Sequence, residues 1–135
     1  KFIFLKQDLD SKEKCLDFII DVLEKDNAVY DEFREAIYKR EKLGVTCLDT
    51  GVALPHADPQ TIKKSRIILL TLKHPVDWGG TLVSLIVVTA FPEEEMNQIR
   101  DVINELYQLI GEKEDVNTFI SFETIQEVLK VFHES

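Results

Sequence analysis

The chain has few of the residues that define disulfide-rich, metal-bound or membrane-spanning proteins. Its 135 residues include only two cysteines, Cys15 and Cys47, whose separation matches neither a disulfide framework nor a zinc knuckle. No apolar run approaches the roughly eighteen residues of a transmembrane helix, and the first residues do not read as a secretory signal peptide. We therefore expect a protein of the reducing cytoplasm, with no metal and no cofactor.

Positive charge is also scarce. Sixteen Lys and Arg residues face 25 Asp and Glu residues, which gives a formal net charge of −9. The densest basic cluster, residues 63–66, is short, and the phosphates of a nucleic acid would be repelled by the rest of the chain. The composition argues against direct nucleic-acid binding. An acidic surface suits a basic protein partner, and it equally suits plain solubility.

The chain does contain enough apolar residues for one hydrophobic core. Hydrophobic residues make up 44% of the sequence and charged residues 30%, the balance of an ordinary globular protein. A chain of this length buries about two-thirds of its unfolded surface. We expect a single domain over residues 1–135 and, because the sequence does not begin with methionine, a domain cut from a longer chain.

Apolar periodicity predicts buried strands between layers of helices. Two nearly continuous β-branched runs, residues 67–72 and 82–88, are typical of central strands covered on both faces, and residues 74–80 between them are turn-rich. A further strand is expected at residues 2–5. The first predicted helix begins near Lys12, with Asp10 or Ser11 as its cap. Further helices are expected over residues 31–40, 94–110 (ended by Gly111) and 115–120. The last predicted helix is capped by Ser121, and its inward residues are Ile125, Val128, Leu129 and Phe132. This order indicates an α/β or α+β layered domain.

One histidine is distinguished by the residues around it. Residues 44–58 form a long connection without periodicity, and long ordered connections are often functional. Within it Leu54 is driven to extended geometry by the proline that follows, and Pro55 fixes its own φ, so His56 is presented from a stiff backbone. A rigidly held imidazole suits nucleophilic or acid–base chemistry, although many histidines are simply surface or structural residues.

The segment from Arg40 to Ala57 resembles a family signature. It reads Arg-Glu, a short spacer with Thr, then Gly, an apolar-Ala-apolar triplet, Pro and His. With the order of the predicted elements, this makes the chain similar to the EIIA domain of the bacterial phosphoenolpyruvate-dependent sugar phosphotransferase system (PTS), of the fructose/mannitol type. The resemblance implies a mixed, mostly parallel sheet with helices on both faces, a three-layer sandwich.

The resemblance also implies a reaction, in which His56 receives a phosphoryl group from phospho-HPr and passes it on. It assigns Arg40 to stabilising the phosphate, and a guanidinium offers a planar fork of donors for the equatorial oxygens. A neutral imidazole has a nitrogen lone pair that can attack phosphorus. Thr46, Thr50 and the backbone at Gly51 are further candidates for phosphate contacts, and both threonines serve equally well as turn caps.

One expected residue is missing. Sugar-transporting members of the family usually carry a second histidine near the start of the long helix, where residues 95–98 read Glu-Met-Asn-Gln. His74 precedes a proline and is expected at the surface. The departure favours a regulatory member, the EIIA-like module of transcription regulators that contain PTS regulation domains, of the BglG/LicR kind. A sugar-specific EIIA component that passes phosphate to an EIIB domain, and an interaction-only domain, remain the alternatives.

A metal-dependent hydrolase is a further alternative, because His56-Ala57-Asp58 has the H-x-D arrangement. Metal sites need three or four converging ligands. The two other histidines, His74 and His133, do not have ligand spacing, so the sequence does not favour this hypothesis.

Overall fold

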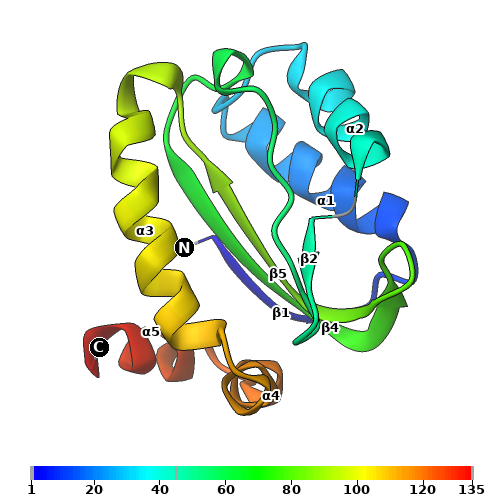
Figure 1. Cartoon of the computed structure of the whole chain (residues 1–135), viewed down its shortest axis with the longest axis vertical. Helices are drawn as coiled ribbons and strands as arrows, with labels where there is room; N and C mark the ends of the chain where they lie inside the picture. The colour runs from blue at the N-terminus through cyan, green and yellow to red at the C-terminus, as the bar shows by residue number, and fades with distance from the viewer. Residues whose placement is uncertain (1, 45, 135) are drawn as a thin grey trace.

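A five-stranded sheet lies between two layers of helices in the computed structural model, which describes residues 2–44 and 46–134, with side chains as far as residue 131 (Figure 1). Helices α1 and α2 cover one face, α3 lies along the other, and α4 and α5 lie at one end of it. The strands are β1 (Ile3–Gln7), β2 (Cys47–Leu48), β3 (Val52–Ala53), β4 (Arg66–Asp77) and β5 (Leu82–Ala90). The helices are α1 (Lys12–Lys25), α2 (Phe33–Leu43), α3 (Met96–Ile110), α4 (Lys113–Ser121) and α5 (Ile125–Glu134), with 3₁₀ turns η1 (Pro59–Thr61) and η2 (Glu93–Glu95).

The sheet is mixed, as expected, but it is not mostly parallel. Its order is β1-β4-β5-β3-β2, in which β1 pairs parallel with β4 and β3 with β5, whereas β4 with β5 and β2 with β3 are antiparallel. The reason is the short connection between β4 and β5, since a tight turn can join only antiparallel neighbours. Gly79 and Gly80 have positive φ values of 69° and 106° in that turn, which favour glycine.

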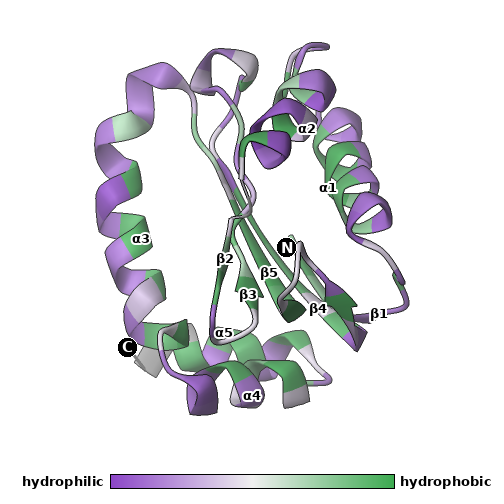
Figure 2. Ribbon diagram, turned by 45° about the vertical axis from the view of Figure 1, so that its right-hand side comes forward, coloured by the Kyte–Doolittle hydropathy of each residue, from purple (hydrophilic) through white to green (hydrophobic). Residues whose placement is uncertain are grey.

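The central parts of the two long strands are buried on both faces, as their continuous apolar runs predict. Alternate residues face opposite layers: Ile68 and Leu70 pack with the α1–α2 layer, whereas Leu69 and Leu85 pack with α3, α4 and α5. Figure 2 shows the hydrophobic faces of α1 and α3 turned toward the sheet. The three-layer expectation is therefore confirmed by two separate cores, one on each side of β4 and β5.

Strand β4 is longer than predicted, and residues 74–77 belong to it, not to the turn. Pairing with β1 ends at Leu72, and the register with β5 is irregular between Thr71 and Val76. Pro75 therefore lies where one edge of the strand has no neighbour, and a proline without an N–H is tolerated there. The exposed His74 on this extension is a surface residue, as expected.

The helix caps agree with the sequence in one case and correct it in another. Ser11 caps α1 by accepting a hydrogen bond from the backbone N–H of Lys14. The cap of α5 is Thr124, not Ser121: Ser121 ends α4, whereas Thr124 and Glu127 form a reciprocal capping box. Hydrogen bonds from the backbone of Glu123 and from Thr124 lower the pKa of the Glu127 carboxyl.

Of the residues expected to turn inward on α5 whose side chains the structure describes, Val128 is fully buried, whereas Ile125 and Leu129 are exposed. The Phe132 side chain lies outside the described residues. Cys15 and Cys47 are both free thiols. Burial in the α1 core raises the pKa of Cys15 to about 12, so this thiol is structural.

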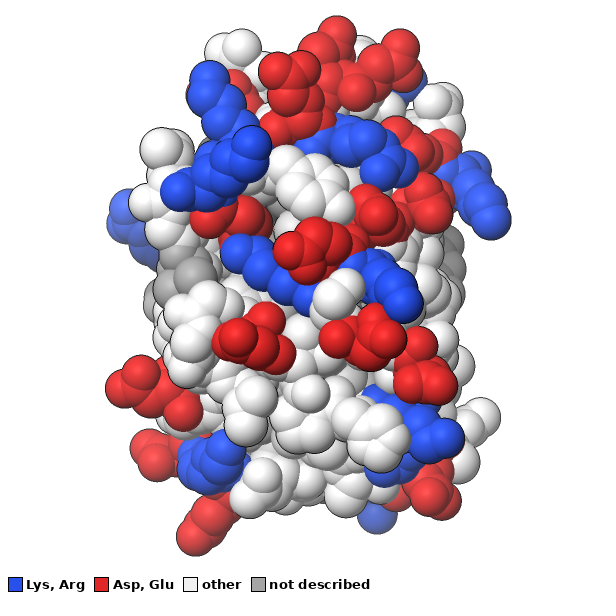
Figure 3. Space-filling view, turned by 90° about the vertical axis from the view of Figure 1, so that its right-hand side faces the viewer, with Lys and Arg blue, Asp and Glu red and all other residues white. Residues whose placement is uncertain are grey.

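Acidic and basic side chains are interspersed on the outer surface of the α1–α2 layer, without a continuous basic stripe (Figure 3). On this face Arg34 pairs with Asp17, Asp21 and Glu24. Within residues 2–44 and 46–134, the helices are too short or too polar for any of them to span a bilayer.

Candidate functional site

The geometry around His56 is set by two buried neighbours. The chain leaves β3 at Ala53, and Pro55 and Ala57 are buried while His56 between them is exposed. Proline fixes the backbone direction at this point. The imidazole is therefore held on a stiff segment, which the sequence motif predicts, and it is exposed to solvent.

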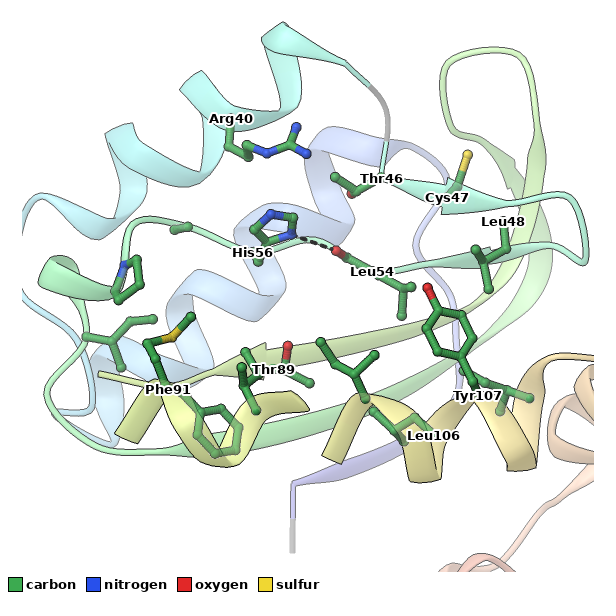
Figure 4. A pocket seen from close by; sticks show the side chains of 17 residues that line it. Arg40, Thr46, Cys47, Leu48, Leu54, His56, Thr89, Phe91, Leu106 and Tyr107 are labelled. Carbon is green, nitrogen blue, oxygen red and sulfur yellow. Dashed lines mark hydrogen bonds between the residues drawn. The ribbon is translucent and has the colours of Figure 1, made fainter. Parts of the chain in front are cut away.

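A backbone contact orients the ring. The Nδ1 atom of His56 lies 3.2 Å from the carbonyl oxygen of Leu54 (Figure 4, dashed line). A carbonyl oxygen can only accept, so this contact is a hydrogen bond when Nδ1 carries the hydrogen. In the neutral ring the lone pair is then on Nε2, the nitrogen away from the backbone.

Arg40 comes to the same place from another element. It lies in the last turn of α2, and its Nη1 donates to the carbonyl oxygen of Gly44 at 3.3 Å. In Figure 4 the guanidinium extends into the space between His56 and Thr46. The structure thus brings together Arg40, Thr46 and His56, three of the residues that the sequence singles out.

These three residues line one end of a mainly apolar pocket of about 510 Å³. Much of its wall comes from α3, where Met96, Ile99, Ile103 and Tyr107 recur at helical spacing. Leu54, β2 and the end of β5 also line it. The Tyr107 ring points toward Leu54 in Figure 4. The imidazole therefore lies where a polar rim meets an apolar wall.

A second hollow, also of about 510 Å³, adjoins His56 and is lined by residues of α2 and of the segment from His56 to Thr61. Its lining includes side chains of both charges, with Glu35 and Lys39 from α2 and Asp58 from the segment before η1, beside apolar residues such as Ala36 and Leu43. Arg40 and His56 line both hollows. A group bound to His56 would consequently border both hollows.

Thr46 lines the pocket, but its hydroxyl is already engaged. Its Oγ1 donates to Glu41 Oε2 at 2.6 Å, and its carbonyl oxygen accepts from the backbone N–H of Leu54, also at 2.6 Å. A hydroxyl has one proton to donate. In this arrangement Thr46 has a structural role, and its hydroxyl does not donate to a phosphate.

Thr50 and Gly51 lie elsewhere, at the tip of the β2–β3 hairpin, and neither lines the pocket. Strand β3, Leu54 and Pro55 separate them from His56, and extended backbone advances about 3.3 Å per residue. Gly51 has φ +92°, and a Cβ there would approach the carbonyl oxygen of Leu82 to 3.2 Å, so the conformation of this turn favours glycine. The Thr50 hydroxyl is buried and has no hydrogen-bond partner among the described residues.

The region where a second histidine was sought lies at the η2–α3 junction. Of residues 95–98, Met96 lines the pocket, and Glu95 accepts a hydrogen bond from the Ser65 hydroxyl. The wall that faces His56 is therefore apolar where the family pattern would place an imidazole.

The H-x-D alternative lacks the ligand geometry it needs. The Asp58 carboxylate accepts from the backbone N–H of Gln60 at 3.0 Å, as the cap of η1. Within the described part of the chain, no three His, Cys, Asp or Glu side chains gather as a metal-ion site would require.

One buried residue at the site was missed by the sequence reasoning. Glu41 is buried and accepts hydrogen bonds from Thr46 and Trp78. A signal was present, because Glu41 follows Phe33 and Ile37 at intervals of four residues and so continues the inward face of α2. A charged residue at a core position indicates a paired or functional group.

Comparison with known proteins identifies the family of the chain. The family model for "Phosphoenolpyruvate-dependent sugar phosphotransferase system, EIIA 2" matches residues 1–135. The chain is 29% identical over 128 residues to the transcriptional regulator ManR of Bacillus subtilis and 25% identical over 132 residues to that organism's probable licABCH operon regulator. It covers 20% and 21% of these two relatives' lengths, whereas the alignment takes in 88% and 98% of the chain itself.

Other relatives are about the same length as the chain. It is 26% identical over 136 residues to the mannitol-specific phosphotransferase enzyme IIA component of Staphylococcus aureus, covering 92% of it. Among solved structures, the complex of enzyme IIA-mannitol and phosphorylated enzyme IIB-mannitol from Escherichia coli matches with TM-score 0.84 at 23% identity, over 99% of this chain and 95% of that one. That likeness establishes the fold, and the full-length family match establishes the family: the chain belongs to the EIIA type-2 family of the phosphoenolpyruvate-dependent sugar phosphotransferase system.

Proposed function

We propose that this chain is a phosphoacceptor domain that takes a phosphoryl group on Nε2 of His56 from phospho-HPr. The observation that carries the proposal is the pair of Arg40 and His56 on one pocket rim, with the Nδ1 side of the ring turned to the Leu54 carbonyl. This orientation leaves the Nε2 lone pair for the incoming phosphorus.

The transfer is a simple exchange of bonds. The Nε2 lone pair forms a bond to phosphorus while the bond from phosphorus to the donor atom of phospho-HPr breaks, and that donor atom keeps the electron pair. The protein's task is in-line positioning and stabilisation of the charge on the equatorial oxygens. Arg40 supplies planar donors for those oxygens. No metal or cofactor takes part in this scheme.

We further propose that the domain is the EIIA-like module, over residues 1–135, of a longer cytoplasmic regulator in which phosphorylation reports sugar flux. Two observations support this. The two Bacillus subtilis relatives are regulators of which the chain covers about a fifth. The α3 wall opposite His56 carries Met96 and Ile99, not a second imidazole that would assist onward transfer.

The alternative is an EIIA component that passes phosphate to an EIIB domain. It is supported by the similarity to the mannitol-specific IIA component of Staphylococcus aureus, which is of comparable length. The two functions share the first step and differ only in what receives the phosphoryl group from His56.

The first step is tested by incubating the domain with phosphoenolpyruvate, enzyme I and HPr and measuring its intact mass. We expect one acid-labile phosphoryl adduct that disappears when HPr is omitted. If the wild-type domain takes up no phosphate, the phosphoacceptor proposal is wrong and the interaction-only alternative is favoured. If the adduct forms, transfer to candidate EIIB domains favours the transport component, and its failure with all of them favours the regulator.

Arg40→Lys is expected to slow phosphorylation about a hundredfold, because removing a preorganised donor from a developing charge commonly costs two to three orders of magnitude. Lysine keeps the positive charge but lacks the planar fork. The rate is measured by quenched-flow mass spectrometry at fixed phospho-HPr. Arg100→Lys, the same change at an exposed position of α3 that lines neither hollow, is the control and should be phosphorylated at the wild-type rate. An Arg40→Lys rate within twofold of wild type would show that Arg40 does not contact the phosphoryl group.

A further inference from the structure

We propose that Glu41 is a positioning residue of the phosphoacceptor site, which holds the His56 ring through Thr46 and Leu54. The inference rests on the proposed role of His56 and adds a residue to which the family resemblance gave no function. It follows from three features: a buried carboxylate, a continuous path of hydrogen bonds, and the place of Glu41 next to Arg40.

The Glu41 carboxylate is an anchor between three elements. Its side chain is 3% exposed, and its Oε1 lies 3.1 Å from the Nζ of Lys12 on α1 and accepts from the indole Nε1 of Trp78 at 3.1 Å. Its Oε2 accepts from the Thr46 hydroxyl at 2.6 Å. A buried carboxylate must be paired, and one with three donors from separate elements is held in place.

From this anchor a path of three hydrogen bonds leads to the acceptor ring. The Thr46 hydroxyl donates to Glu41 at 2.6 Å, the Leu54 N–H donates to the Thr46 carbonyl at 2.6 Å, and His56 Nδ1 lies 3.2 Å from the Leu54 carbonyl. The first hydrogen bond fixes Thr46, the second fixes the Leu54 backbone, and the third fixes the His56 ring. The last step holds the hydrogen on Nδ1 and leaves Nε2 for phosphorus.

The same carboxylate also fixes how the last turn of α2 is rotated about its axis. Glu41 follows Arg40 directly, and consecutive helical residues point about 100° apart. When Glu41 is fixed in the interior, Arg40 is directed to the pocket rim. One buried charge therefore orients both the phosphoacceptor and the residue that binds the phosphoryl oxygens.

The Trp78 contact extends this anchor to the β4–β5 turn. The Trp78 ring is fully buried, and Lys12 Nζ lies 5.6 Å from its centroid, so the cation contacts both the carboxylate and the indole. The path to His56 begins at Glu41 Oε2, whereas Lys12 and Trp78 hold Oε1. Oε1 therefore fixes the carboxylate in the core, and Oε2 connects it to Thr46. A variant of Thr46 removes the second contact and leaves the first in place.

The test compares the unphosphorylated wild type with Glu41→Gln and Thr46→Val by ¹⁵N NMR of the His56 ring. Glutamine has a single acceptor oxygen for the donors of Glu41, and valine has the shape of threonine without the hydroxyl. We expect both variants to lower the population of the tautomer with hydrogen on Nδ1. Phosphorylation by phospho-HPr is expected to slow about tenfold in both, since small displacements of reacting groups cost this much or more.

Two controls separate positioning from general loosening. Thr46→Ser retains the hydroxyl and is expected to restore both readings to wild-type values. Ile37→Val removes a methyl group one turn earlier on the buried face of α2 and is expected to lower the thermal midpoint without changing the tautomer population.

Wild-type tautomer populations and rates in both Glu41→Gln and Thr46→Val would overturn the inference. The inference would also be overturned if Ile37→Val changed the tautomer population and the rate as much as these two variants do. The tautomer reading needs no phosphate, so it decides the role of Glu41 even if the wild type accepts none. A phosphorylated wild type whose Glu41 and Thr46 variants behave identically to it would refute the inference and leave the proposed function intact.

Discussion

Replacing His56 by glutamine is expected to abolish phosphoryl uptake and to leave the fold unchanged. The amide has no nitrogen lone pair able to form the bond to phosphorus, so no adduct should appear by intact mass after incubation with phosphoenolpyruvate, enzyme I and HPr. Because the His56 side chain is exposed, the free energy of unfolding should change by about 0.5 kcal/mol or less.

The matched control for this experiment is His74→Gln. His74 is also exposed, but it lies on the β4 extension and lines neither hollow. We expect it to be phosphorylated at the wild-type rate. An adduct that survives in His56→Gln and is lost in His74→Gln would assign the phosphate to the other histidine.

Trp78→Ala is expected to lower the free energy of unfolding by about 4 kcal/mol, because truncating a large buried aromatic ring to alanine typically costs about 3–5 kcal/mol. Trp78 is 0% exposed and packs in the core beneath α1 and α2. Its loss would also remove the indole donor from Glu41, which leaves a buried carboxylate with one partner fewer. Urea unfolding followed by circular dichroism measures the change.

Leu82→Ala provides the comparison for Trp78. Leu82 begins the next strand after the turn and is 66% exposed, so its truncation should cost less than about 0.5 kcal/mol. A Trp78→Ala variant within about 1 kcal/mol of wild type would show that the turn repacks around the missing ring, contrary to the buried anchor described here.

The sequence predicts the parts of this molecule whose signal is local. The two long strands, the amphipathic α3 and the rigid mount of His56 all follow from apolar runs, periodicity or a proline, because each depends on neighbouring residues alone. The Arg-to-His motif predicts which side chains should meet, and Arg40 and His56 do line the same pocket.

The parts that the sequence did not predict depend on contacts between distant segments. Strands β2 and β3 have two residues each, too few for a periodic pattern, and they form because β5 offers an edge for β3 to pair with. That hairpin moves Thr50 and Gly51 away from the site that their motif positions indicated. Two of the three partners of Glu41 come from α1 and from the β4–β5 turn, and no local pattern joins those segments to α2.

The parallel pairing of β1 with β4 has a consequence for how the chain folds. Ile3 is aligned with Leu69, so this contact closes a loop that contains α1, α2 and the β2–β3 hairpin. Closing a long loop costs entropy before any contact repays it, and the β4–β5 hairpin closes a much shorter loop at a smaller cost. We therefore expect the hairpin to form early and β1 to dock last, so the sheet stays open at one edge until the acceptor histidine and its surroundings are in place.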